Sequence, residues 1–406
     1  MADDLVALRR RLHREPELGL DLPRTQEKVL AALDGLPLEI TLGQASSSVT
    51  AVLRGGADDG EAGGAGRRPA VLLRGDMDAL PVRENTGLAD ASTVDGVMHA
   101  CGHDLHTAML VGAAHLLCAR RTELAGDVVL MFQPGEEGWE GAQHMIDEGV
   151  LDASGQRVAA AYALHVFSAA LPLGQFGGRA GAITAASAML RVAVRGAGGH
   201  GSMPHRASDP VTAAAEMVLG LQTMVTRQFD VFDPVVITVG VLHAGTRRTI
   251  IPEEAVFEAT VRTFSARTAE RVERATGRLL RGIADGHGVE VDVAFVPERP
   301  ATMNHAGTTA LAARAIAETF GDQRYTALDH PLACSEDFSR VLARVPGSLV
   351  ALGATAPGAD PGNAPFNHSP RARFDEAVLP DGAALYADLA DRTLTEGTVG
   401  SGQPPR

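Results

Sequence analysis

The sequence predicts an α/β fold in which a catalytic domain has a largely parallel sheet flanked by helices, plus an inserted ferredoxin-like α+β domain. Two patterns predict it. Short apolar or β-branched runs alternate with helical periodicity in the first and last parts of the chain, whereas the middle part follows a different order. The length of 406 residues agrees with two domains, because single hydrophobic cores stop growing at about 250–300 residues.

The first part of the chain supplies most of the predicted parallel sheet. Two amphipathic helices are separated by Pro16 and Gly19, which break helical periodicity, and four apolar runs follow as strands. The predicted helices cover residues 4–15, 25–36, 105–120 and 142–148, and the predicted strands cover residues 48–55, 70–76, 127–134 and 160–166.

The middle part reads as strand, helix, two strands, helix and strand, which is the order of a ferredoxin-like unit. These elements are predicted at residues 186–196, 209–228, 233–245, 253–264, 266–287 and 289–297. We therefore place the inserted domain at residues 185–298 and the catalytic domain at residues 1–184 and 299–406.

After the insertion the α/β pattern resumes. Helices are predicted at residues 308–320, 336–343 and 381–393, with a strand at residues 348–354. We expect the polar, glycine-rich tail, residues 397–406, to be disordered.

Composition excludes several classes of protein. A formal net charge of −14 argues against nucleic acid or an anionic membrane as a partner. No apolar run reaches the roughly 18 residues of a membrane span, and the charged N-terminus lacks a secretory signal. Three widely spaced cysteines suit free thiols in a reducing compartment, so we expect a cytoplasmic protein.

The chain has a single lysine, Lys28, on a predicted surface helix. A phosphate-binding Walker loop needs a lysine after its glycines, and none stands there. A Schiff-base or pyridoxal-phosphate enzyme would have to use Lys28 itself.

Several groups with metal-binding chemistry follow the strands of the predicted parallel sheet. Asp76 and Asp78 end the strand 70–76, the adjacent Glu136 and Glu137 follow the strand 127–134, and His165 ends the strand 160–166. In open α/β sheets, ligands bind beyond the carboxyl ends of the strands. The stretch "HACGHD" adds Cys101 and His103, and "FNHSP" adds His368.

Each of these residues has an ordinary explanation when it is taken alone. A buried cysteine is usually a small apolar side chain, an aspartate at a strand end can cap the next turn, and paired glutamates are usually solvated. Together, however, thiolate, imidazole and carboxylate are the ligand types of Zn²⁺ and neighbouring ions. Adjacent Glu136 and Glu137 can also divide the roles of ligand and base, which a hydrolase needs.

At this point the sequence resembles a known group, the metal-dependent amidohydrolases that include hippurate hydrolases, aminoacylases and plant auxin-conjugate hydrolases, relatives of the glutamate carboxypeptidases. The resemblance covers nearly the whole chain. The motifs that carry it are "RGDMDALPV", "HACGHDLHTAML", "FQPGEEG", "ALHV", "GGHGSMPH", "VRTF", "SEDFS" and "NHSP".

The resemblance implies a site with two divalent metal ions. Its ligands match Cys101, His103, Glu137, His165 and His368, and its general base matches Glu136. Asp78 matches an acid that orients the ligands, and Asp104 is expected to be a similar support. Asp76 stands where the carboxypeptidase relatives have a metal-binding histidine, so it is not taken as a ligand. The thiolate favours Zn²⁺, with Mn²⁺, Co²⁺ or Ni²⁺ as alternatives.

For the inserted domain, the resemblance implies a lid and dimerisation module. His200 matches a histidine that reaches the scissile carbonyl, often in the partner subunit, and Arg262 matches a contact to the substrate carboxylate. Thr249 stands where relatives carry an asparagine, so the grip on substrate is expected to differ. His205 and Trp139 are further candidates for the substrate pocket.

These observations predict a homodimeric metal-dependent amidohydrolase that cleaves an N-acyl amino acid of the hippurate or N-acetyl type. The nearest alternative is a dipeptidase or carboxypeptidase with the same site. A third possibility is a non-catalytic metal-binding homologue. The presence of both glutamates and of every ligand type argues against it.

Overall fold

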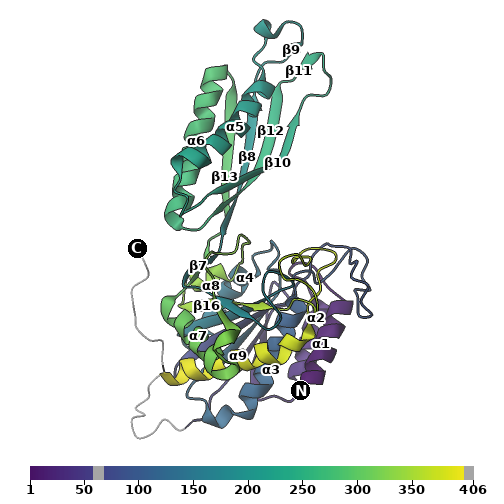
Figure 1. Cartoon of the computed structure of the whole chain (residues 1–406), viewed down its shortest axis with the longest axis vertical. Coiled ribbons are helices and arrows are strands. Elements are labelled where there is room, and N and C mark those ends of the chain that lie inside the picture. The colour runs from purple at the N-terminus through teal and green to yellow at the C-terminus, as the bar shows by residue number, and fades with distance from the viewer. Residues whose placement is uncertain (58–67, 397–406) are drawn as a thin grey trace. The chain divides into compact units, whose positions relative to one another are not determined.

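The computed structural model describes residues 1–57 and 68–396 and divides into two compact units (Figure 1). The second unit comprises Thr184–Thr302 and Pro331–Ser339, and the first comprises the rest. The sequence predicted residues 185–298 for the insertion, so the structure extends it slightly and adds a segment assigned to the catalytic domain. The predicted disordered tail, residues 397–406, lies outside the described residues.

The first unit is built on an eight-stranded sheet with the order β1-β2-β4-β3-β5-β16-β6-β15. The neighbours β4, β3, β5 and β16 are parallel, whereas β1, β2 and β4 pair antiparallel, as do β16 and β6. This confirms the predicted largely parallel centre. The strands are β1 (Leu38–Leu42), β2 (Val49–Leu53), β3 (Ala70–Asp76), β4 (Asp127–Gln133), β5 (Ala160–Phe167), β6 (Phe176–Gly178), β15 (Tyr325–Ala327) and β16 (Gly347–Gly353).

Helices cover this sheet because its central strands are buried on both faces. Every residue of β3, β4 and β16 is buried, which explains their continuous apolar runs. Helix α3 is apolar on nearly all sides because it contacts β3, α1 and α9. The helices are α1 (Ala2–Arg14), α2 (Pro23–Leu33), α3 (His103–Ala119), α4 (Gly141–Asp147), α7 (Ala306–Phe320), α8 (Ser339–Leu342) and α9 (Leu379–Glu396).

The second unit is a four-stranded antiparallel sheet with the order β10-β12-β8-β13. Helices α5 and α6 cover one face (Figure 1), and the strands alternate buried and exposed positions accordingly. This arrangement confirms the predicted ferredoxin-like unit. Its elements are β8 (Ala186–Arg195), α5 (Pro210–Gln228), β10 (Val236–Ala244), β12 (Glu254–Thr263), α6 (Ala266–His287) and β13 (Glu290–Arg299).

Two small ladders complete the structure. Strands β9 (Gly199–His200) and β11 (Ile250–Ile251) form one, and β7 (Gly181–Thr184) and β14 (Thr302–Asn304) form the other. The helix predicted at residues 336–343 is too long, because only the single turn of α8, Ser339–Leu342, is helical there. Among the described residues, no helix is long and apolar enough to cross a membrane.

Candidate metal centre

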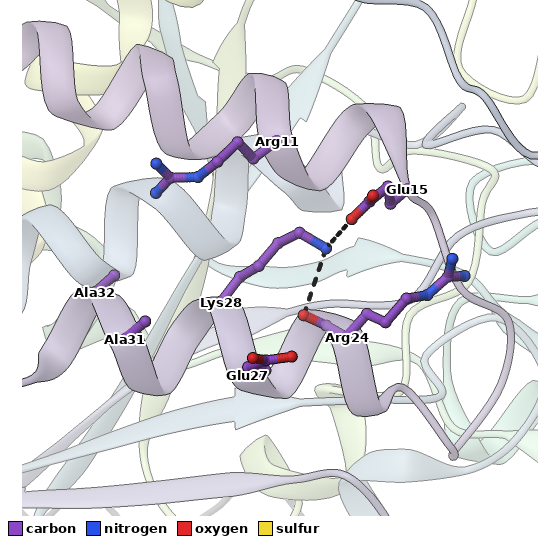
Figure 2. A pocket seen from close by; sticks show the side chains of 7 residues that line it. All are labelled: Arg11, Glu15, Arg24, Glu27, Lys28, Ala31 and Ala32. Atoms are coloured by element: carbon purple, nitrogen blue, oxygen red, sulfur yellow. Dashed lines mark hydrogen bonds and ion pairs between the residues drawn. The ribbon is translucent and has the colours of Figure 1, made fainter.

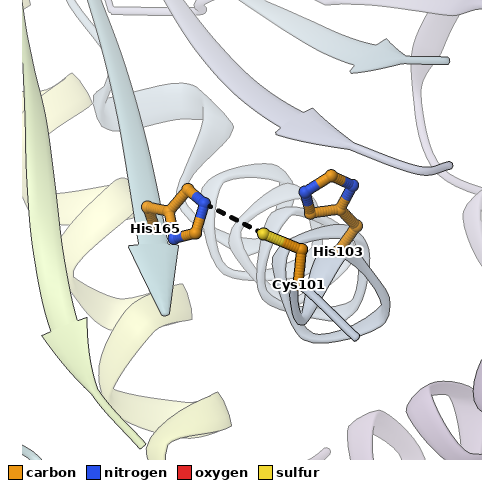
Figure 3. Close-up of side chains that lie close together, drawn as sticks. All are labelled: Cys101, His103 and His165. Carbon is orange, nitrogen blue, oxygen red and sulfur yellow. Dashed lines mark hydrogen bonds between the residues drawn. The ribbon is translucent and has the colours of Figure 1, made fainter. Parts of the chain in front are cut away.

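The carboxyl ends of β3, β4 and β5 bring the predicted ligands together. The thiol sulfur of Cys101 lies 3.6 Å from Nε2 of His165 and 3.3 Å from Nε2 of His368. The same His368 nitrogen lies 3.2 Å from Oε1 of Glu137. Figure 3 shows Cys101 between His165, on β5, and His103, at the start of α3.

All five predicted ligands occur in overlapping groups whose potential ligand atoms lie within 4.8 Å of one another. One group is Cys101, His103 and His165, and another is Cys101, Glu137 and His368. A third joins His103 to Glu136 and Glu137. We call these five ligands, without Glu136, the metal centre.

Gly102 allows Cys101 and His103 to face the same space. Its φ is +84°, in the left-handed region, and a Cβ there would lie 2.4 Å from a methyl carbon of Val166. A side chain at this position is therefore excluded by both backbone and space. The turn places the thiol immediately before His103, where helix α3 begins.

Asp78 fixes three parts of the centre at once. Its carboxylate accepts hydrogen bonds from the backbone N–H groups of Glu136, at 3.0 Å, and Glu137, at 2.9 Å. Its carbonyl accepts a 2.9 Å hydrogen bond from Nδ1 of His103. Asp78 thus holds the glutamate turn and orients a candidate ligand.

His103 provides the observation that tests whether an ion fits. Its Nδ1 donates to the carbonyl of Asp78, while its Nε2 is buried, lies 3.6 Å from Oδ2 of Asp76 and makes no hydrogen bond among the described residues. An unsatisfied buried imidazole nitrogen is costly, and a metal ion would satisfy it. Thiol, imidazole and carboxylate around this atom are a donor set that suits Zn²⁺ and its neighbours.

The protonation states of Cys101 and His103 depend on whether a cation lies between them. Burial, followed by the charge of Glu137, raises the pKa of the Cys101 thiol well above its usual range. Burial would lower the pKa of His103, but the Asp76 carboxylate, Asp78 and Cys101 together outweigh burial and raise this pKa. Without a cation both groups therefore keep their protons, and a bound cation would displace them.

Asp76 lies beneath the metal centre in a fully buried polar cluster. Arg74 lies 2.5 Å from its Oδ2, and Nδ1 of His106 donates a 2.6 Å hydrogen bond to its Oδ1. The other nitrogen of His106 accepts a 2.8 Å hydrogen bond from the backbone N–H of Val166, next to His165. His106 thus connects the ends of β3 and β5.

This role of His106 was not predicted from the sequence. Its position three residues after His103 places both rings on one side of α3, and this spacing was the available signal. The spacing alone does not tell which ring faces the ligands and which faces Asp76.

Asp104 does not support the ligands in the way that was expected. Its carboxylate faces away from them toward α1, where it lies 2.8 Å from Nε of Arg9 and accepts a 2.8 Å hydrogen bond from Nδ1 of His13. Burial would lower the pKa of His13, but Asp104 and Glu84 together outweigh burial and raise this pKa to about 9. Asp104 therefore anchors the start of α3 to the N-terminal helix.

The substrate residues predicted for the insertion all lie in the second unit. His200 on β9 pairs with Ile250 on β11, and the carbonyl of Thr249 accepts a 2.8 Å hydrogen bond from the N–H of Gly201, so Thr249 lies beside His200 at this two-stranded ladder. The imidazole of His200 lies 2.8 Å from the Ser202 hydroxyl.

Of the other two predicted residues of this unit, His205 lies in a short 3₁₀ helix that contacts β9, whereas Arg262 lies on β12. His205 is exposed in a single turn of 3₁₀ helix, and Arg262 on β12 donates a 3.0 Å hydrogen bond to the Ser335 hydroxyl. Trp139, by contrast, belongs to the first unit and follows Glu137 by two residues.

A separate hollow of about 640 Å³ lies between α1 and α2 (Figure 2). Lys28 forms a 2.6 Å ion pair with Glu15 there, and the remaining lining is Arg11, Arg24, Glu27, Ala31 and Ala32. None of these residues belongs to the metal centre. Arg24 is likewise paired, with Glu17, and such mixed surface charges give this hollow no chemistry of its own.

Comparison with known proteins agrees with this geometry. The family model of peptidase family M20/M25/M40 matches residues 72–392. N-acetylcysteine deacetylase of Bacillus subtilis (strain 168) is 35% identical over 387 residues, covering 95% of this chain and 96% of that protein. IAA-amino acid hydrolase ILR1-like 4 of Arabidopsis thaliana is 34% identical over 398 residues, covering 97% of this chain and 86% of that protein.

A solved structure is also similar over nearly the full length of both chains. The Bacillus subtilis YXEP protein, described as a dinuclear metal binding peptidase from the M20 family, superposes with a TM-score of 0.82 at 31% identity. The match covers 97% of this chain and 98% of that chain. Sequence, fold and ligand geometry together show that this chain belongs to peptidase family M20/M25/M40.

Proposed function

We propose that this enzyme, a metal-dependent amide hydrolase, cleaves N-acyl amino acids to a carboxylate and a free amino acid. The observation that carries the proposal is the convergence of five ligand-type side chains around Cys101, with Glu136 on the same turn as Glu137. Two similar proteins are named as a deacetylase of N-acetylcysteine and a hydrolase of IAA-amino acids, which are substrates of this class.

The metal centre is proposed to hold two divalent ions. Cys101, His103, Glu137, His165 and His368 would be their ligands, and the buried thiol with three imidazoles favours Zn²⁺ over Mn²⁺, Co²⁺ or Ni²⁺. When bound, such ions polarise the scissile carbonyl and acidify a water molecule. Asp78 keeps Glu137 and His103 oriented for this task.

Glu136 is proposed as the general base. Asp78 fixes its backbone, and its side chain is buried at the turn, next to Glu137. The Glu136 carboxylate takes a proton from the attacking water while the oxygen bonds to the acyl carbon. As the C–N bond breaks, the same carboxyl gives that proton to the departing amine, so the products are a carboxylic acid and an amine.

Residues of the second unit are proposed to complete substrate binding. The exposed imidazole of His200 suits a donor to the oxyanion, and the guanidinium of Arg262 suits the free carboxylate of the amino acid. Thr249, beside His200, offers one hydroxyl where relatives carry an amide, and exposed His205 is a further contact.

A homodimer through the second unit is also proposed. Strand β10 is an edge strand whose residues Val236 and Leu242 are 46% and 51% exposed. An apolar edge strand in water invites pairing with another strand, and a second copy of this chain would cover it. A cytoplasmic location would suit the three free cysteines.

A carboxypeptidase or dipeptidase with the same centre is the alternative, because the chemistry of the two reactions is the same. It differs in the substrate, which would carry a free amine on the acyl side. A panel of N-acetyl and N-benzoyl amino acids beside dipeptides, tested after reconstitution with Zn²⁺ or Mn²⁺, separates these functions.

The role of Glu136 has its own test. In Glu136→Gln we expect unchanged metal content and a kcat lower by roughly 10²- to 10⁴-fold, the usual size of a general-base effect. Glu140→Gln, on the same turn, is the matched control and should keep its activity. Loss of metal from Glu136→Gln with residual turnover would show that Glu136 is a ligand. Absence of hydrolysis across the panel by the metal-loaded wild type would overturn the proposed function.

A further inference from the structure

Trp139 is the only tryptophan in the chain, and 56% of its surface is exposed beside the metal centre. It follows Glu137 by two residues, on a tight turn in which the N–H of Gly138 donates a 2.7 Å hydrogen bond to the carbonyl of Glu136. A large exposed indole is unfavourable in water and is a common feature of binding sites.

Trp139 packs against two glycines, Gly19 at its indole ring and Gly135 at its Cβ. A Cβ at Gly19 would lie 3.1 Å from Cε2 of Trp139, and a Cβ at Gly135 would lie 3.0 Å from Cβ of Trp139. Both glycines have φ values near the left-handed region, +76° and +70°, which other residues rarely adopt. One side of the indole therefore rests on backbone, which leaves its exposed surface for a ligand.

The loop beneath Trp139 is tied to the metal centre. The N–H of Ala79, which follows Asp78, donates a 2.8 Å hydrogen bond to the carbonyl of Glu17, and Leu18 bridges to Ala79. Leu18 is itself 40% exposed. Because Asp78 also holds the glutamate turn, the exposed side chains of Leu18 and Trp139 belong to one rigid rim.

A second exposed aromatic residue lies beside another ligand. Phe167 stacks on His165 with ring centroids 4.8 Å apart, and Phe366 lies 5.8 Å from Phe167. Phe366 is 44% exposed and precedes His368 by two residues. Two ligands of the metal centre thus each have an exposed aromatic residue close by in the chain.

The charges on the turn indicate which end of a substrate fits there. Glu136, Glu137 and Glu140 are all acidic. Basic groups that contact them include Arg340, which pairs with Glu140, and His368, 3.2 Å from Glu137. Arg340 is already paired with Glu140, and residues 134–141 offer no cationic side chain to the free carboxylate of an amino acid, whereas an uncharged acyl group needs none. An apolar acyl group also covers the indole, which an acetyl group is too small to do.

We propose that Trp139 forms an acyl-group subsite that favours a large aromatic acyl group over an acetyl group. This inference rests on the proposed function, since it assigns one end of an N-acyl amino acid to the rim of the metal centre. Trp139 acts as a specificity-determining residue that contacts the substrate and leaves the bond-breaking steps to Glu136 and the metal centre.

The first test uses the intrinsic fluorescence of Trp139 in metal-loaded Glu136→Gln, which binds substrate without rapid turnover. N-benzoylglycine should change this fluorescence saturably, at a concentration about tenfold lower than N-acetylglycine needs. Because Trp139 is the only tryptophan, the signal reports this side chain alone. Equal titration midpoints for the two ligands, or no response to N-benzoylglycine, would overturn the subsite.

The second test uses the ratio of kcat/KM for N-benzoylglycine to that for N-acetylglycine. Trp139→Ala should lower the ratio about tenfold, and Trp139→Phe should restore most of it, because a ring remains to stack on. Phe232→Ala removes an exposed aromatic residue of the second unit and should leave the ratio unchanged. A ratio that Trp139→Ala does not alter would refute the inference while hydrolysis itself upholds the proposed function. Saturable binding without hydrolysis of either compound would refute the function and keep the subsite.

Discussion

His103 and His106 lie one helical turn apart on α3 and serve different purposes. His103 leaves Nε2 unsatisfied among the described residues, as a ligand does before its ion binds. His106 uses both nitrogens, with Asp76 and with the backbone N–H of Val166. Since Nε2 of His106 accepts, Nδ1 carries the proton, and the ring is a fixed neutral link between two strand ends.

This link predicts the effect of His106→Leu. The change leaves Asp76 with fewer hydrogen-bond donors and removes the acceptor of the Val166 N–H. The free energy of unfolding should therefore fall by about 1–3 kcal/mol. Because Val166 follows His165, we also expect metal affinity to fall roughly 10- to 100-fold, measured by competition with a chelator.

His115→Leu is the matched control for that substitution. His115 also lies on α3, but its Nε2 donates a 3.0 Å hydrogen bond to the carbonyl of Ala32, on α2. His115→Leu should lower the free energy of unfolding without changing metal affinity. Equal metal affinities for His106→Leu and the wild type would show that His106 serves packing alone.

The sequence predicted which residues converge but not how each is oriented. The side chains of Cys101 and His368 meet although the two residues are 267 positions apart. Their convergence could be predicted because the resemblance names both residues and because the strand-end positions of other ligands imply a common edge of the sheet. Asp104 was expected to face the ligands and faces α1 instead. Side-chain direction on a buried helix depends on which element packs against each side, and periodicity does not reveal that for a helix buried nearly all round.

At the scale of elements, α1 is joined to the start of α3 by buried charges. Asp104 lies close to Arg9 and His13, and Nε2 of His13 lies 3.3 Å from the Glu84 carboxylate. Burial would raise the pKa of Glu84, but hydrogen bonds from His13, the Ser92 N–H and the Thr86 hydroxyl together outweigh burial and lower this pKa to about 2. The protonated imidazole of His13 therefore lies between two carboxylates.

This cluster makes stability depend on pH. The pKa of His13 rises from 6.5 to about 9 on folding, so its contribution is fully present below pH 6.5 and is lost as the pH rises through about 9. At about pH 6 the wild type should exceed His13→Gln in unfolding free energy by on the order of 2 kcal/mol, and the gap should narrow by about pH 9.5.

Urea denaturation of both proteins at each pH measures this difference. All other titratable groups are shared by the two proteins, so to first order the difference isolates His13. A gap that stays constant or widens with pH would contradict the proposed charge state of His13.

Long elements followed from the sequence better than short ones. The helix predicted at residues 266–287 has the same bounds in the structure, because Ser265 caps it and Gly288 ends it in the left-handed region. Strands β6 and β15 have three residues each and were not predicted. Such strands are too short to show alternation, and only their neighbours in the sheet define them.

At the scale of the whole molecule, the exposed edge of β10 predicts self-association. Leu242→Glu places a charge on this apolar edge, and we expect a dimeric wild type to become monomeric in light scattering. Ile40→Glu places the same charge on β1, the edge strand of the other sheet, and should leave the oligomeric state unchanged. A dimer that persists in Leu242→Glu would move the interface to another surface.

The last prediction concerns which subunit supplies His200. Glu136 lies in the first unit and His200 in the second, so a dimer can combine them within one chain or between two. Glu136→Gln and His200→Ala should each be nearly inactive alone. If His200 acts on the partner subunit, a mixed dimer has one site with both residues intact. Random reassembly of equal amounts should then restore about a quarter of wild-type activity, because half of the dimers are mixed and each has one complete site. If His200 acts within its own chain, no site in the mixture has both residues, and mixing should restore nothing.

Adding Leu242→Glu to both variants should abolish the recovery, because that substitution separates the subunits. Recovery that survives it would mean that the edge of β10 does not form the dimer.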